Sequence, residues 1–282
     1  MKQITTDYVQ NIIIPRPADM HKGQAGRVLI IAGSKGMAGA AVLAARGTLY
    51  SGAGLVKVSV PDELFTILQI SVPEAMCIDR EEASSADLNV YDAICIGPGI
   101  GTEEEAMSLL YRVLNDYSGP LVIDADGINC LCRYGALREI KDRGSVTVFT
   151  PHPGEAGRML ESLGLESYSK LGREGTVKTL SKATGAIVLL KGPQTLISDG
   201  ADTYMNPTGN PGMATGGSGD VLSGIITSLL AQKHLTADPL DRVCAAAFLH
   251  GVAGDIAADN IGEYGMTSAD IADAVASAFN AL

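Results

Sequence analysis

The sequence predicts an α/β fold with a mostly parallel central sheet and helices on both faces. Two observations support it. Short continuous apolar runs rich in β-branched residues recur along the chain, and helical patterns separate them. Parallel strands that are covered on both faces need such runs, and each return to a parallel neighbour needs a crossover. The runs are residues 27–33, 55–60, 93–97, 121–124, 146–150 and 185–192.

The segments between and after these runs follow the same plan. Small residues over 39–51 predict a first helix, and residues 102–116 predict a second. The second helix starts with three glutamates, 103–105, which we interpret as a solvated first turn that suits the helix dipole. Residues 195–206 predict a hairpin that turns at an Asp-Gly pair, so antiparallel strands are expected at one edge of the sheet.

The last third of the chain predicts helices. One apolar stripe at the helical period consists of Val221, Leu222, Ile225, Ile226, Leu229 and Leu230. A second stripe spans 240–252, and residues 267–282 predict a final helix. No internal repeat, low-complexity tract or linker interrupts the pattern. A single domain over residues 1–282 is therefore expected.

Composition and charge exclude several classes of protein. The chain has 282 residues, of which 46% are hydrophobic and 19% charged, as in soluble globular proteins. Its formal net charge is −11, from 21 Lys and Arg against 32 Asp and Glu, and the cations form no cluster. This argues against a nucleic-acid or anionic-membrane partner. A polyanion would have to be held locally by backbone amides and a few cations.

The cysteines and the N-terminus favour the cytoplasm. The five cysteines are an odd number, and the close pair at 130 and 132 lacks metal-ligand spacing, so reduced thiols are expected. The first ten residues contain no apolar secretion signal, and no run approaches the ~18 apolar residues of a membrane span. We predict a soluble cytoplasmic protein.

Chemistry-bearing residues follow the predicted strands. In open α/β sheets ligands bind outside the carboxyl ends of the strands, so these residues are expected to converge. Taken singly, each has a structural alternative: Asp124 could bind only loop backbone, Lys191 could solvate a strand end, and GPGIG could be a plain turn. The residues in question are Gly33, Ser34, Gly36, Gly39, the GPGIG of 97–101, Asp124, Asp126, Asn129, the PHPGE of 151–155, Lys191 and Gly192.

The stretch NPGMATGGSGDVLSGII, residues 210–226, combines five glycines with one carboxylate at the start of a predicted helix. Residues 216–219 fall where the unpaired N–H groups of a helix N-terminus point outward, and glycine lets a phosphate reach them. Asp220 lies in the first turn. The structural alternative is that Asp220 only caps a helix entered through a glycine-rich loop.

His152 stands between Pro151 and Pro153. Both prolines fix φ and lack an N–H donor, so this segment is stiff and cannot join the sheet. A rigid loop that presents an imidazole favours ligand contact over core packing.

Several of these blocks together resemble the ADP/ATP-dependent NAD(P)H-hydrate dehydratases, a branch of the ribokinase-like superfamily. GxGD alone would indicate only the superfamily, but the combination is specific and covers nearly the whole chain. The blocks are HKGQAGRVLIIAGS (21–34), GAAVLAARGTLYSGAGLVKV (39–58), GPGIG (97–101), DADGIN (124–129), TPHPGE (150–155), KGPQTLI (191–197) and NPTGNPGMATGGSGDVLSGII (206–226).

The resemblance implies a three-layer ribokinase-like sandwich and a repair reaction. The S form of NADH hydrate or NADPH hydrate would be dehydrated at the expense of ADP or ATP, through phosphorylation of the C6 hydroxyl and elimination of phosphate. Mg²⁺ would assist, held mostly by phosphates and water, so no protein metal ligand is assigned. Many relatives carry a preceding epimerase domain, whereas the HKG block begins here at residue 21. The resemblance also implies a homotetramer.

The implied site residues carry over position by position. Asp220 would be the catalytic base. The hydrate would contact Ala40, Gly101, His152 and Asp220, with Ala41 an equal alternative to Ala40. The remaining implied residues are Lys191, Gly192, Pro193, Gln194, Thr195 and Gly219 for the nucleotide, and Gly216, Gly217, Ser218 and Gly219 for an anion hole.

Two other classes of protein share part of this pattern. A small-molecule kinase of the same superfamily, acting on a vitamin precursor or a sugar, also has GxGD and the base, but PHPGE together with NPTGN favours the dehydratase. A nucleotide-binding regulator without turnover has no need of Asp220 and Lys191. The preference between ADP and ATP, and between the two hydrates, stays open.

Overall fold

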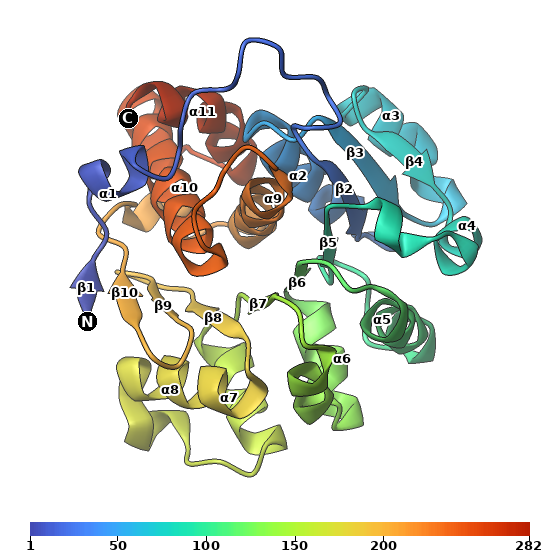
Figure 1. Ribbon diagram of the computed structural model, residues 1–282, viewed down its shortest axis with the longest axis vertical. Helices are drawn as coiled ribbons and strands as arrows, with labels where there is room; N and C mark the ends of the chain where they lie inside the picture. Colours follow the sequence, from blue (N-terminus) through green and yellow to red (C-terminus); the bar gives the residue numbers. More distant parts are fainter.

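The computed structural model describes residues 1–282 and places ten strands in one sheet, in the order β1-β10-β9-β8-β7-β6-β5-β2-β3-β4 (Figure 1). The strands are β1 Lys2–Gln3, β2 Arg27–Ile31, β3 Leu55–Ser59, β4 Met76–Ile78, β5 Ala93–Ile96, β6 Leu121–Ile123, β7 Thr147–Phe149, β8 Ile187–Leu190, β9 Leu196–Ser198 and β10 Thr203–Met205. All six predicted runs form strands. The fold class is therefore confirmed as a mostly parallel α/β sheet.

The predicted hairpin is also present. β9 is antiparallel to β8 and to β10, while β4, β3, β2, β5, β6, β7 and β8 run parallel to one another. β1 pairs in parallel with β10 and forms the outermost strand at that side. β1 and β4 are not predicted from the sequence, because strands of two and three residues are too short for a period-two pattern.

Helices cover both faces of the sheet, as Figure 1 shows. The core on one face includes Val28 and Ile30 of β2, and the core on the other includes Leu29 and Ile31, as strand alternation requires. On the first face lie α1 Thr6–Gln10, α2 Ala38–Tyr50, α3 Phe65–Ser71, α9 Ser218–Ala231, α10 Pro239–Ile261 and α11 Ser268–Asn280. On the second lie α4 Arg80–Ser85, α5 Glu104–Asp116, α6 Asp126–Tyr134, α7 Pro153–Ser162 and α8 Tyr168–Thr184. Four short 3₁₀ turns complete the chain: η1 Asp62–Leu64, η2 Leu88–Val90, η3 Leu137–Arg143 and η4 Pro211–Met213.

Helix α9 differs from the expectation of a single apolar stripe. Every residue from 221 to 231 is buried, because α9 lies in the interior between α2, α10 and the sheet. Two glycines make the approach of α2 possible. A Cβ on Gly224 would lie 2.2 Å from the Ala44 carbonyl oxygen, and a Cβ on Gly47 would lie 2.3 Å from that of Val221. The glycine-rich loop therefore leads into a rigid, fully packed helix.

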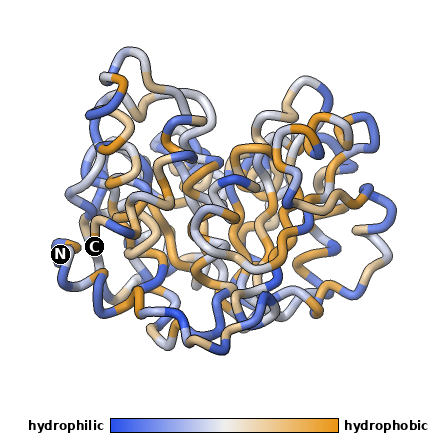
Figure 2. The backbone as a smooth tube through the Cα atoms, turned by 90° about the horizontal axis from the view of Figure 1, so that it is seen from above, coloured by the Kyte–Doolittle hydropathy of each residue, from blue (hydrophilic) through white to orange (hydrophobic).

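Hydrophobic residues gather in the middle of the molecule, and hydrophilic ones lie mainly in the outer loops (Figure 2). All five cysteines are free thiols, as expected, and three of them are buried. None of the helices is both long enough and apolar enough to cross a lipid bilayer.

Candidate active site

The residues that follow the predicted strands meet at one edge of the sheet, as expected. The carboxyl ends of the parallel strands β2, β5, β6, β7 and β8 all open there, and the N-terminus of α9 joins them. Lys191 after β8 contacts Asp124 after β6, and Ser223 of α9 contacts the same carboxylate. Groups distant in the sequence thus form one connected polar cluster.

Asp124 lies at the centre of this cluster and is fully buried. One carboxylate oxygen accepts from the Ala125 N–H at 2.8 Å and from Lys191 Nζ at 2.9 Å. The other accepts from Ser223 Oγ at 2.6 Å. Asp124 does bind loop backbone, as the structural alternative proposed, but it also pairs with the lysine. These three hydrogen bonds compensate for the burial of the carboxylate, which would be costly without donors.

Lys191 lies between two carboxylates. Its Nζ is 3.8 Å from Glu155 Oε2 in addition to its bond with Asp124. Burial lowers the pKa of Lys191, but the negative charges of Asp124 and Glu155 outweigh burial, so the pKa is raised and the amine stays charged. Gly219 lies directly beside it, since a Cβ there would be 3.1 Å from Nζ. The Lys191 ammonium group therefore lies next to the GxGD loop.

Asp220 is the third residue of α9 and is largely buried. Burial, and then the nearby Asp124 carboxylate, raise its pKa to about 7, although Lys191 acts in the opposite direction. Asp126 and Glu155 contribute to the same rise, with smaller effects. A carboxylate whose pKa lies near neutral pH is suited to accept and release a proton.

The loop before Asp220 presents open backbone donors. The N–H groups of Gly216, Gly217 and Gly219 have no acceptor within the protein, whereas Ser218 N–H bonds to the Thr215 carbonyl at 3.4 Å. The Ser218 side chain is buried, with its Oγ 3.4 Å from His250 Nε2. Free N–H groups at the N-terminus of a helix form a site for an anion such as phosphate.

His152 occupies a helix N-terminus, which changes the expectation of a free rigid loop. It is the N-cap of α7, with Pro153 as the first helical residue. Its Nδ1 accepts from the Gly154 N–H at 2.9 Å, and Glu155 Oε2 accepts from the His152 N–H at 2.7 Å. The imidazole is half exposed, and its Nε2 lies 3.4 Å from Glu155 Oε1. Glu155 therefore links His152 to Lys191.

Two further predicted residues lie on the neighbouring loops. The Gly101 N–H donates to Asp126 Oδ2 at 2.9 Å. Ala40 lies in the first turn of α2 and contacts the GPGIG loop, since a Cβ on Gly99 would be 3.0 Å from the Ala40 Cβ. Ala41 is completely buried, whereas Ala40 is partly exposed. Of the two alanines, only Ala40 is accessible to a ligand.

The NPTGN segment, residues 206–210, has a structural role. The Asn206 amide donates to the Ala247 carbonyl at 2.9 Å, and the Thr208 hydroxyl donates to that of Phe248 at 2.9 Å. The Asn210 amide donates to Asp255 Oδ1 at 2.9 Å. These bonds fasten the segment along α10.

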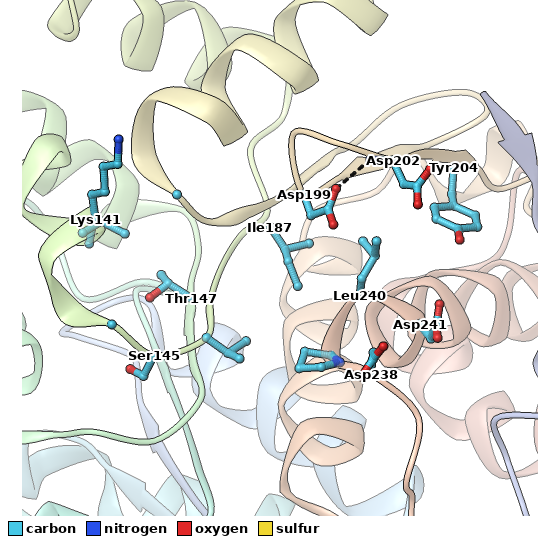
Figure 3. A pocket seen from close by; sticks show the side chains of 15 residues that line it. Lys141, Ser145, Thr147, Ile187, Asp199, Asp202, Tyr204, Asp238, Leu240 and Asp241 are labelled. Atoms are coloured by element: carbon cyan, nitrogen blue, oxygen red, sulfur yellow. Dashed lines mark hydrogen bonds between the residues drawn. The ribbon is translucent and has the colours of Figure 1, made fainter.

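A cavity of about 720 Å³ lies at the opposite edge of the sheet, where β7, β8 and α10 begin (Figure 3). Three of the four carboxylates that line it, those of Asp199, Asp202 and Asp241, have structural partners. Asp199 accepts from the N–H groups of the hairpin turn, Asp202 pairs with Lys2 at 3.2 Å, and Asp241 accepts from the Tyr8 hydroxyl. These contacts fasten the N-terminus and the hairpin, and the cavity lies apart from the Asp220 cluster.

Two members of the polar cluster, Glu155 and Ser223, were not predicted from the sequence as site residues. Glu155 was noted only as part of PHPGE, and Ser223 was not singled out, although it lies one helical turn after Asp220 and so shares a face with it. The burial of the Glu155 side chain could not be inferred from the sequence.

The sheet, the two helical layers and the acid at the start of α9 define a protein of the ribokinase-like fold. The family model for NAD(P)H-hydrate dehydratase matches residues 28–277, and the chain belongs to that family. It is 37% identical over 264 residues to the ADP-dependent (S)-NAD(P)H-hydrate dehydratase of Lactiplantibacillus plantarum, a match that covers 92% of this chain and 90% of that one.

Other relatives are longer. The chain is 39% identical over 268 residues to the bifunctional NAD(P)H-hydrate repair enzyme of Coxiella burnetii, covering 92% of this chain and 51% of that one. It spans about half the length of the bifunctional relatives that it matches. Among solved structures, the ADP/ATP-dependent NAD(P)H-hydrate dehydratase of Bacillus subtilis, co-crystallized with ATP and Mg²⁺, superposes with a TM-score of 0.88 at 30% identity, over 99% of this chain and 98% of that one.

Proposed function

We propose that this protein dehydrates the S form of NADH hydrate or NADPH hydrate back to the dinucleotide, and that it consumes ADP or ATP in doing so. One observation carries the proposal: Asp220, whose pKa burial raises to about 7, directly follows the open N–H groups of Gly216, Gly217 and Gly219, and the Lys191 ammonium group lies beside Gly219. The similarity to the L. plantarum dehydratase, over nine-tenths of that protein, supports the substrate class.

The chemistry follows from this arrangement. Hydroxide is a poor leaving group and phosphate a good one, so the C6 hydroxyl of the hydrate is phosphorylated before it leaves. The Asp220 carboxylate accepts the hydroxyl proton as the oxygen attacks the terminal phosphorus of the nucleotide, and AMP or ADP leaves. Backbone N–H groups of residues 216–219 stabilise the charge on the transferred phosphoryl group. The lone pair of the ring nitrogen then expels phosphate from C6, and loss of a proton from C5 restores the 5,6 double bond.

The two ligands occupy different sides of Asp220 in this proposal. The hydrate contacts Ala40, Gly101 and His152, and the accessibility of Ala40 supports its place there. The nucleotide lies along residues 191–195 and against Gly219. Lys191 contributes a fixed positive charge for its phosphates.

The site suits a Mg²⁺ ion that is held mainly by the nucleotide phosphates and water. No group of three or more His, Cys, Asp or Glu side chains is arranged to chelate a metal ion. The carboxylates of Asp124, Glu155 and Asp220 nevertheless all act on the single ammonium group of Lys191, and burial together with the neighbouring carboxylates raises the pKa of Asp220. Bound with the phosphates of the nucleotide, Mg²⁺ would supply further positive charge to the transferred group. These carboxylates would face it.

We also propose that the chain acts as one domain, because all ten strands belong to one sheet. Its setting is the cytoplasm, which the five free thiols support. A homotetramer is proposed on the strength of apolar side chains exposed on α3 and β4. The net charge of −11 argues against nucleic acid as a partner.

A repair assay tests the function. Purified protein is incubated with NADH hydrate or NADPH hydrate, each with ADP and with ATP, while the absorbance of the restored dihydronicotinamide is followed. We expect recovery that depends on the nucleotide and releases phosphate in equal amount. Nucleotide consumption on a vitamin precursor or sugar, without hydrate repair, would instead identify a small-molecule kinase.

A further inference from the structure

Residues 191–195, which we propose to bind the nucleotide, form a loop fastened at both ends. The Lys191 N–H donates to the Pro151 carbonyl at 2.8 Å, and the Asn206 N–H donates to that of Thr195 at 2.9 Å. Within the loop the Thr195 hydroxyl donates to the Gly192 carbonyl at 3.0 Å. The two ends are thereby tied to the PHPGE and NPTGN segments.

The middle of the loop is held by one side chain from another element. The Arg173 guanidinium in α8 donates through Nη1 to the Pro193 carbonyl and through Nη2 to the Gln194 carbonyl, the latter at 3.2 Å. Arg173 forms no ion pair with a carboxylate. Its planar fork suits two adjacent acceptors, which a single ammonium group cannot match.

Helix α8 is shaped to present this arginine. Gly172 breaks the helix with φ +63° and ψ −175°, and Arg173 is the first residue after the break. The helix beyond the break is anchored, because Thr176, Val177 and Leu180 are buried against the core. The base of the arginine is therefore fixed relative to the sheet.

The contacted loop has a conformation that needs support. Gln194 has φ +52°, a left-handed conformation that is unfavourable for a residue with a Cβ. Of the two carbonyls that Arg173 binds, one belongs to Gln194 and the other to Pro193, the residue before it. Without the arginine, the loop gains freedom to relax to a more favourable conformation.

We propose that Arg173 is a positioning residue that holds the nucleotide loop in its binding shape by bridging the Pro193 and Gln194 carbonyls. The proposal rests on the function proposed above, in which this loop binds ADP or ATP. Arg173 acts through the loop and not on the reacting atoms. Its loss is expected to weaken nucleotide affinity while kcat at saturating nucleotide changes little.

The experiment is a double-mutant cycle with Arg173→Ala and Gln194→Gly, read by calorimetric ADP binding and by the KM for ADP. We expect Arg173→Ala to weaken ADP binding roughly tenfold, or ~1.4 kcal/mol. Gln194→Gly should recover part of that loss in the double variant, because glycine adopts positive φ without steric cost. Additive effects, or unchanged affinity in Arg173→Ala, would overturn the proposal.

Two further variants separate the alternatives. Lys178→Ala removes the same charge from the same helix, but Lys178 pairs only with Glu174, so ADP affinity should not change. Arg173→Lys keeps the charge without the fork and should weaken binding; wild-type affinity there would overturn the proposal even if Arg173→Ala did not fold. Failure of the wild-type protein to bind ADP or ATP, or to repair the hydrate, would instead count against the proposed function.

Discussion

At the scale of single residues, the acidity of Asp220 is the property that the site controls most closely. Burial and the Asp124 carboxylate raise its pKa from the ordinary 3.8 to about 7. The folded protein thus holds this proton more tightly than the unfolded chain does. The contribution of Asp220 to the free energy of unfolding therefore falls as the pH rises from its ordinary pKa to about 7.

Replacing Asp220 by Asn should abolish most turnover without loss of stability. Asn has nearly the same shape but cannot accept the hydroxyl proton, and loss of a general base typically lowers the rate by ~10²–10⁴-fold. Because the ionised carboxylate is unfavourable in this site, thermal stability above neutral pH should stay equal or rise. Steady-state kinetics beside thermal unfolding checks both; a near-normal rate would remove Asp220 as the base.

The pH profile of kcat/KM should have an acidic limb governed by Asp220, with activity rising as the pH passes through about 7. Asp126 raises this pKa, so Asp126→Asn should move the limb to lower pH. Asn can still accept the Gly101 N–H bond, so the loop keeps its anchor. A limb that does not move in this variant would mean that another group controls the profile.

His152 has two roles that two substitutions can separate. His152→Ala removes the N-cap of α7 and should cost ~0.5–2 kcal/mol of stability. His152→Asn keeps a capping side chain. Both should lower kcat/KM for the hydrate by roughly 5- to 150-fold, through ~1–3 kcal/mol of lost hydrogen bonding, with little change in nucleotide affinity.

Kinetics on the hydrate, calorimetry with ADP and thermal unfolding are measured together on the two His152 variants. Normal hydrate kinetics in His152→Asn would show that the imidazole serves only as a cap.

At the scale of elements, two glycines at the start of α9, Gly217 and Gly219, have different roles. Gly217 has φ +92°, and a Cβ there would lie 2.3 Å from Leu43 Cδ1 and 2.8 Å from Ser268 Oγ. Gly219 lies within the helix, and the nearest atom to its Cβ position is the flexible end of Lys191, at 3.1 Å. Gly217 thus permits the fold of the loop, while Gly219 keeps space beside the ammonium group.

Alanine at the two positions should affect different properties of the protein. Gly217→Ala should lower stability by ~1–3 kcal/mol because of its positive φ, and further through the contact with Leu43. Gly219→Ala should leave thermal unfolding nearly unchanged and raise the KM for the nucleotide roughly tenfold. Measurements of both properties on both variants decide; a Gly219→Ala protein with a normal KM would show that no phosphate approaches there.

At the scale of the whole molecule, the surface over α3 and β4 exposes apolar side chains to solvent, which is unfavourable. Ile67 and Ile70 of α3 and Met76 of the edge strand β4 are exposed, Ile70 by 77%. In the proposed tetramer this surface is a natural place for contact between copies. Ile70→Glu should then shift the protein toward smaller species in light scattering, with its fold unchanged. An unaltered mass would exclude this surface from the interface.

The order of the longer strands along the chain was predictable because each buried strand is a continuous apolar run. Lys191 and Asp124 could be placed at the same edge because each follows such a run directly, whereas Asp220 lies at the start of a helix and was assigned to the site from its glycine-rich motif. Helices α6, α7 and α8 were not predicted individually, although α6 and α7 each bury one apolar face. His152 was expected in a free loop and lies instead at the N-cap of α7.

By itself the sequence determined the fold class, the family resemblance and the residue types available for chemistry, since these depend on local pattern and on motif. Only the tertiary structure decided what those residues can do. The pKa of Asp220 depends on Asp124, Asp126, Glu155 and Lys191, which folding brings within electrostatic reach. The hydrogen bonds from Arg173 to the Pro193 and Gln194 carbonyls likewise form only when the chain folds. Distances between side chains set charge, burial and hydrogen bonding, and no local pattern encodes them.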